Sequence, residues 1–119
     1  MSETTTAEAQ ARDAAETWLR FIDAGDANAS WMHASSTFRG AVSEAQWQDS
    51  LGSVQGSLGR PLRRELESAE FTRELPGAPD GEYVVIKYRT TFEKKQNGTE
   101  TVVPELDDTE WKVSGYFVK

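Results

Sequence analysis

The sequence predicts an α+β domain in which three N-terminal helices pack on a curved antiparallel sheet of about four strands. Three observations lead to this fold class. Apolar residues recur at helical spacing up to residue 58, alternation with a period of two dominates after residue 82, and turn signals separate the later segments. Helices followed by a meander of strands are typical of α+β proteins. The length of 119 residues suits one domain, and we expect a flexible N-terminus over residues 1–5 and a single domain over residues 6–119.

The composition argues against several classes of function. The chain has no cysteine, which excludes disulfides, thiolate catalysis and cysteine-based metal sites. Its net charge of −7 disfavours binding to nucleic acid, because such binding relies on Lys and Arg to neutralise phosphates. No apolar run approaches membrane-spanning length, so we expect a soluble protein without membrane insertion.

The N-terminus lacks the basic and apolar regions of a signal peptide. Two compartments therefore stay open: the cytoplasm, or the periplasm and envelope for a mature form whose leader has been removed. The sequence indicates no oligomeric state.

The first helix is expected to begin at a capping box formed by Thr5 and Glu8 and to end at Gly25. The spacing of Trp31 and Phe38 predicts a shorter second helix that ends at Gly40. The apolar face of the first helix contains Ala7, Ala11, Ala14, Ala15, Trp18, Leu19 and Ile22.

A third helix is predicted to start at Ser43. Ser43 and Gln46 have the spacing of a capping box, while Val42 and Trp47 have that of a hydrophobic staple. Gly59, followed by a proline two residues later, should end this helix. Its buried stripe is expected to contain Trp47, Leu51, Val54 and Leu58.

Residues 62–75 fit either a helix or an edge strand, and we interpret them as a strand because the following sheet needs a partner. A loop rich in turn residues covers residues 75–81. The clearest strand runs from residue 82 to residue 93, and Asn97-Gly98 predicts the hairpin that follows it. Pro104 in the return strand suggests a bulge or a sheet edge, and residues 111–119 form the last strand.

Several sequence blocks resemble the DUF4019 family of uncharacterised bacterial domains. These blocks are Trp18-Leu19, Asp23-Ala24-Gly25-Asp26, Ser30-Trp31, Phe38-Arg39, Trp47, residues 75–85, Glu100-Thr101-Val102 and residues 111–116. The resemblance implies a fold similar to nuclear transport factor 2 and the ketosteroid isomerases, in which a bent sheet wraps a long helix in a cone and encloses a pocket. Family members often look exported or membrane-anchored, from which this N-terminus departs. The resemblance carries over no catalytic residues.

Few residue types in the chain suit acid/base chemistry. His33, the only histidine, is interpreted as exposed or as a helix cap, and a general base lining a pocket is the alternative. Isomerase-like sites combine a carboxylate base with a Tyr donor. The residues available for such a site are Asp23, Asp26, Tyr88 and Tyr116. We expect Asp23 to end the first helix in solvent, Asp26 to cap the second helix, and both tyrosines to be explained by folding.

We therefore predict no catalytic residues, no metal site and no cofactor. A mostly apolar pocket is the hypothesis for binding, with the Tyr88 hydroxyl as its polar group. A cone filled by its own tryptophans is the competing outcome. The lining residues of that pocket are expected to be Trp18, Ile22, Val84, Ile86, Tyr88 and Phe92. The function favoured by the sequence is a non-catalytic module that binds a small apolar ligand or a protein partner, and the alternative is a small isomerase or dehydratase.

Overall fold

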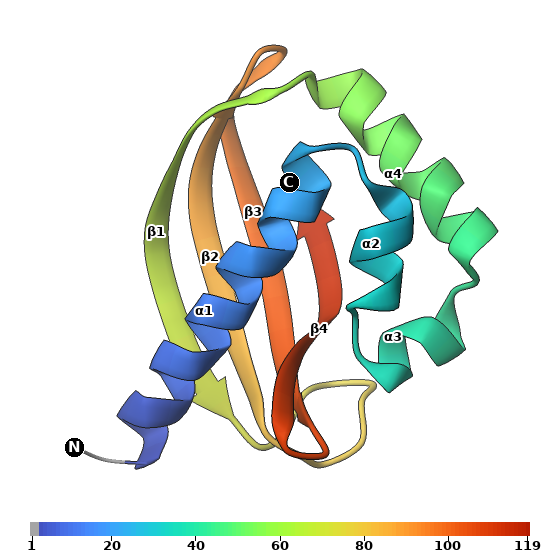
Figure 1. The fold of residues 1–119 in the computed structure, drawn as a ribbon. Helices are drawn as coiled ribbons and strands as arrows, with labels where there is room; N and C mark the ends of the chain where they lie inside the picture. Colours follow the sequence, from blue (N-terminus) through green and yellow to red (C-terminus); the bar gives the residue numbers. More distant parts are fainter. Residues whose placement is uncertain (1–2) are drawn as a thin grey trace.

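The computed structural model describes residues 3–119 and shows an α+β fold in which the helices precede the strands (Figure 1). Residues 1 and 2 of the expected flexible segment lie outside the described residues. The helices are α1 (Glu3–Asp23), α2 (Ala27–Met32), α3 (Ser36–Ala41) and α4 (Glu44–Leu58). The strands are β1 (Pro61–Thr72), β2 (Tyr83–Phe92), β3 (Lys95–Asp107) and β4 (Glu110–Val118).

Helix α1 crosses one face of the sheet, while α2, α3 and α4 lie beside it (Figure 1). It begins before Thr5, so this residue lies inside the helix and not at the predicted N-cap. The carboxylate of Glu8 instead accepts a hydrogen bond from the backbone N–H of Phe71 in β1. The predicted end is confirmed, because Gly25 has a φ of 70° and closes a Schellman motif, with its N–H bonded to the carbonyl of Ile22.

The segment expected to form one second helix forms two short helices, α2 and α3. Ser35 causes the break: its hydroxyl accepts a hydrogen bond from the backbone N–H of Phe38, and its own N–H donates to the carbonyl of Val113 at 2.8 Å. This second bond fixes the break to β4. Gly40 lies within α3 and does not end it. Described residues 3–119 thus contain four helices, one more than predicted.

Helix α4 confirms the predicted capping box, since the Ser43 and Gln46 side chains bond reciprocally to each other's backbone. Its predicted apolar stripe is correct only for the first half. Trp47 and Leu51 are buried, but Val54 is 36% exposed and lies outside the core. The second half of α4 therefore packs less closely than its sequence pattern suggests.

The sheet is antiparallel with the order β1-β2-β3-β4. Strand β1 confirms the interpretation as a strand for residues 62–72, and it ends before residues 73–75. The predicted position of the hairpin is wrong: the chain turns at residues 93–94, and Gly98 lies within β3 opposite Thr90. The glycine is needed there because a Cβ atom would lie 2.8 Å from the ring of Phe92.

The sheet bends around α1 (Figure 1), and both edge strands carry extra residues that interrupt the ladder. On β1 these residues are Leu62 and Glu67, and on β4 the extra residue is Ser114. The irregularity on β4 lies opposite Val103 and Pro104, so of the two alternatives predicted from this proline the bulge is confirmed, and the sheet edge is wrong because β3 is an inner strand. Bulges bend and twist the strands that contain them, so they account for part of the curvature.

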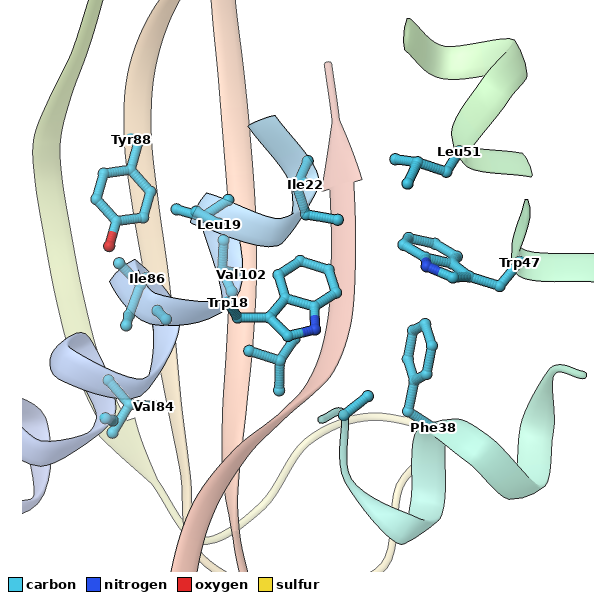
Figure 2. Close-up of a cluster of buried hydrophobic side chains, with 14 residues drawn as sticks. Trp18, Leu19, Ile22, Phe38, Trp47, Leu51, Val84, Ile86, Tyr88 and Val102 are labelled. Atoms are coloured by element: carbon cyan, nitrogen blue, oxygen red, sulfur yellow. The ribbon is translucent and has the colours of Figure 1, made fainter. Parts of the chain in front are cut away.

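The core lies between the sheet and the helices, with Trp18 of α1 near its centre (Figure 2). Phe38 and Trp47 lie on the helix side, and the Trp18 ring is 6.5 Å and 6.0 Å from these two rings. The indole N–H groups of Trp18 and Trp47 both bond to Ser30, at its carbonyl and its hydroxyl respectively. The tryptophans thereby join α1, α2 and α4 into one layer.

Candidate functional site

A group of polar side chains extends from the interior between α1 and the sheet to the surface at the end of α1. We call this group, which consists of Asp23, Arg64, Thr90, Glu100 and Tyr116, the interior polar cluster. Each member comes from a different element, because Asp23 ends α1 and the others lie on β1, β2, β3 and β4. Glu100 has no exposed surface, so its carboxylate depends on protein partners for the hydrogen bonds that water would supply.

The carboxylate of Glu100 accepts four hydrogen bonds. Its Oε1 atom accepts from the Arg64 Nε at 2.6 Å and from the Thr90 hydroxyl at 2.5 Å. Its Oε2 atom accepts from the Tyr116 hydroxyl at 2.6 Å and from the Arg64 Nη2 at 3.1 Å. Both oxygens are therefore fully used within the protein.

Arg64 also forms a two-pronged contact with Asp23, with both N–O distances at 2.9 Å. Burial lowers the pKa of Arg64, but its hydrogen bonds to Asp23 and Glu100 outweigh burial and raise the pKa above its usual value. Burial, together with the negative charge of Glu100 and the hydrogen bond to it, raises the pKa of Tyr116 far above its usual value. The arginine thus stays charged and the phenol stays protonated.

A small hollow of about 20 Å³ adjoins the interior polar cluster beneath α4. This volume is about what one water molecule requires. Glu100 and Tyr116 contribute to its wall on the sheet side. Its other lining residues are Ile22, Asp23, Leu51, Val54, Gln55, Leu58, Gly59, Pro61 and Phe92. The hollow can hold no substrate-sized molecule as the structure stands.

The six side chains predicted to line an apolar pocket are all buried. Trp18, Val84 and Ile86 lie in the core, and Figure 2 shows Val84, Ile86 and Tyr88 in a row on the sheet side. Ile22 and Phe92 line the small hollow. The structure thus divides the predicted set between the packed core and the hollow.

The Tyr88 hydroxyl was predicted as the polar group of that pocket. It is buried and has no hydrogen-bond partner within residues 3–119. Burial and the negative charge of Glu16 raise the pKa of Tyr88 to about 12. This phenol therefore stays neutral and donates to no group of the described chain.

The other candidates for acid/base chemistry have structural roles. Asp26 is the N-cap of α2, as predicted, and its side chain accepts a hydrogen bond from the backbone N–H of Ala29. Asp23 ends α1 as predicted, but it pairs with Arg64 instead of lying free in solvent. His33 is exposed at the C-cap of α2, and its ring stacks on that of Phe21.

Sequence reasoning missed Arg64 and Glu100. Arg64 lies in the segment whose type was ambiguous, so its face could not be assigned. The expected hairpin at Asn97-Gly98 placed Glu100 beside a turn, where a carboxylate would be solvated. In the true register Glu100 lies opposite Tyr88, on a strand flanked by β2 and β4. Glu100 and Val102 are two residues apart and so lie on the same face of the strand, and this alternation was the available signal that Glu100 faces inward.

Within the part of the chain that the structure describes, no group of three His, Asp or Glu side chains could hold a metal ion. None of the described helices is long and apolar enough to cross a membrane. No curated protein matches the sequence at the significance required. A family model does match, described as a protein of unknown function (DUF4019), and it spans residues 14–116, a range that includes every member of the interior polar cluster. The chain therefore belongs to the DUF4019 family.

Proposed function

We propose that this domain is a non-catalytic module that binds a small, mostly apolar molecule between α4 and the sheet, in an NTF2-like cone. Ile22 and Phe92 would contact the ligand, and the other predicted lining residues would form the apolar layer behind them. The observation that carries the proposal is the state of Glu100, whose two oxygens already accept four hydrogen bonds. A general base needs a free lone pair within reach of a substrate proton.

The packing of α4 supports a site that opens beneath this helix. Two glycines, Gly52 and Gly56, lie in its last two turns, and glycine in a helix costs about 1 kcal/mol relative to alanine. Grooves of about 450 Å³ and about 370 Å³ flank the helix, the first toward the α1–α2 turn and the second toward the end of β4. Space on both sides would let this half of α4 move without displacing the core.

A side-chain hydrogen bond connects this end of α4 to α1. The Gln55 amide donates to the carbonyl of Ile22 at 2.6 Å, directly above the hollow. The next contact along the helix is made from the hairpin, where the Lys94 ammonium donates to the carbonyl of Gly56 at 3.0 Å. Loss of the Gln55 contact would expose the apolar wall formed by Ile22, Leu51 and Phe92.

A small isomerase or dehydratase is the second candidate. The observation that favours it is the 2.6 Å hydrogen bond between Tyr116 and Glu100, which brings a phenol and a carboxylate together inside the fold. Such a pair has the residue types of an isomerase site. Catalysis would require Glu100 to give up a partner, which is unfavourable for a carboxylate without exposed surface.

The test uses the neutral fluorescent probe N-phenyl-1-naphthylamine with the complete chain. We expect saturable binding and amide shift changes at Ile22 and Phe92. Gly56→Ala should weaken binding about twofold to fivefold, because a stiffer helix opens less often. Gln55→Ala should strengthen binding by a similar factor. Gly40→Ala in α3 is the matched control, since a Cβ atom at Gly40 or Gly56 meets no atom within 4 Å.

Shift changes confined to other surfaces, or equal effects of Gly56→Ala and Gly40→Ala, would disprove the site beneath α4. The enzyme candidate is tested separately, by following deuterium exchange from D2O into a panel of cyclic ketones. Exchange that the wild type accelerates and Glu100→Gln abolishes would establish catalysis and overturn the non-catalytic proposal.

A further inference from the structure

Another concave feature lies along α1, where this helix faces β4. This feature, which we call the α1–β4 groove, has a volume of about 340 Å³. Trp18 and Phe21 of α1 line one wall, Trp111 of β4 lines the other, and His33 at the end of α2 closes one end. A volume of this size falls at the lower end of the range for small-molecule sites.

Of the aromatic residues that line the α1–β4 groove, Phe21 and Trp111 keep accessible surface, whereas Trp18 is only 2% exposed. Phe21 and Trp111 are half-buried against the core, so each retains an accessible part. The rings of Phe21 and His33 are stacked, with centroids 5.0 Å apart and planes at 17°. This stacking joins the end of α1 to the end of α2 and keeps the aromatic wall in place.

Two carboxylates, those of Asp13 on α1 and Glu110 on β4, also line the groove. Both residues are exposed, and neither forms an ion pair with another residue of the described chain 3–119. Lys112 lines the groove as well, so two carboxylates face one ammonium group. Negative charge therefore predominates along the groove.

We propose that the α1–β4 groove binds a small organic cation whose charge is carried by an alkylated ammonium group. Aromatic faces attract such cations through the ring quadrupole, and they solvate the alkyl groups that a plain ammonium lacks. The carboxylates of Asp13 and Glu110 supply the complementary charge at the rim. The net charge of −7 raises the local concentration of cations over the whole surface. This site is separate from the one proposed beneath α4, and each can fail without the other.

The test compares choline with 3,3-dimethyl-1-butanol, which has the same shape but carries a carbon in place of the charged nitrogen. Both are titrated at low salt and at about pH 8, where histidine side chains are generally neutral. Tryptophan fluorescence and amide shift mapping report binding. We expect choline to shift Phe21, His33 and Trp111, with at least about fivefold weaker binding of the neutral alcohol. A trimethyllysine peptide, tested in the same way, shows whether a free molecule or a protein side chain fits better.

Three variants locate the site. Asp13→Asn and Glu110→Gln should each weaken choline binding by about twofold to fivefold, while keeping the size of the side chain. Trp111→Leu should weaken it about tenfold, because the apolar wall remains but the ring is lost. Asp49→Asn is the matched control, since Asp49 is an exposed carboxylate on α4 that does not line the groove.

Equal binding of the two isosteric probes would overturn the proposal, as would choline shifts outside the groove. The same conclusion follows if Asp49→Asn weakens binding as much as Asp13→Asn. Because the two carboxylate variants leave the residues of the hydrophobic core intact, their result stands even if Trp111→Leu proves too unstable to measure.

Discussion

The side chain of Arg64 reaches across the whole width of β2 to contact Glu100, with its Nε atom 2.6 Å from the Oε1 atom of the carboxylate. The two residues lie on β1 and β3, strands that share no backbone hydrogen bonds. Thr90, the β2 residue between them, donates its hydroxyl to the same carboxylate. An ion pair thus connects non-adjacent strands on the inner face of the sheet.

Arg64→Met should destabilise the fold by about 3–5 kcal/mol, because it leaves the carboxylate of Glu100 buried without its counter-charge. The measurement is the free energy of unfolding from denaturant titration. Arg63→Met is the matched control. Arg63 is exposed and pairs with Glu65 at the surface, so its loss should change stability by less than about 1 kcal/mol. Equal effects of both variants would show that the pair with Glu100 contributes nothing particular.

The two interior tyrosines should respond oppositely to loss of their hydroxyl groups. Tyr88→Phe should leave stability unchanged or raise it by about 1 kcal/mol, because the Tyr88 hydroxyl is buried without a partner among residues 3–119. Tyr116→Phe should lower stability by about 1.5–3 kcal/mol, because it removes a hydrogen bond to a charged group. Denaturant midpoints at neutral pH compare the two.

Tyr88 also predicts a dependence on alkaline pH. Its pKa is raised to about 12, chiefly by burial, so the folded state retains a proton that the unfolded state loses near pH 10. The contribution of Tyr88 to the free energy of unfolding is fully present below about pH 10 and declines as the pH rises toward 12. Tyr88→Phe should show a shallower decline over that interval, and parallel curves for the two proteins would contradict the prediction.

Asp107 gives the opposite dependence at acidic pH. The backbone N–H and hydroxyl of Ser36, in the first turn of α3, donate to its carboxylate at 2.8 Å and 3.1 Å, and its pKa is lowered mainly by the first of these bonds. A lowered pKa means that the contribution is present above the unfolded value of about 3.9 and is lost as pH falls through the lower folded value. Asp107→Asn should be less stable than wild type at neutral pH. The gap should close as the pH falls below the lowered folded-state pKa of Asp107, and a constant gap would refute the assignment.

Gly98→Ala should destabilise the protein by about 1–3 kcal/mol through overpacking. A Cβ atom at this position would lie 2.8 Å from the ring of Phe92 and 3.0 Å from the backbone carbonyl of Thr90, and the carbonyl cannot move aside without breaking the strand. Gly52→Ala on α4 meets no atom within 4 Å and should be stabilising. Thermal midpoints of both variants provide the comparison, and a neutral Gly98→Ala would mean that the ring of Phe92 can shift.

The sequence predicted those elements that local chemistry determines. The Schellman end of α1 at Gly25 and the capping box of Ser43 depend on residues within one turn, so their patterns could be read directly. The break between α2 and α3 could not be read from a local pattern, because Ser35 also requires the carbonyl of Val113, a residue of the last strand. The prediction of the hairpin position failed for the same reason, since the ring of Phe92 determines where Gly98 must lie.

The interior polar cluster was harder to predict than the fold. Its members lie at positions 23, 64, 90, 100 and 116, and only the finished sheet brings them together. Trp18, Tyr88 and Phe92 were named as candidates for the lining of an apolar pocket. Arg64 and Glu100 looked like ordinary surface charges, since a charged residue shows its burial only when the register of the strands is known.

The extra residues in the two edge strands have a consequence for self-association. A regular strand edge is a template on which another chain can add its own strand, and this is a common route to aggregation. Leu62 and Glu67 divide the edge of β1 into short regular stretches, and Ser114 divides that of β4. A strand from a second molecule would lose register after only a few residues on either side. The same bulges that curve the sheet around α1 thereby leave its open edges poorly suited to growth into fibrils.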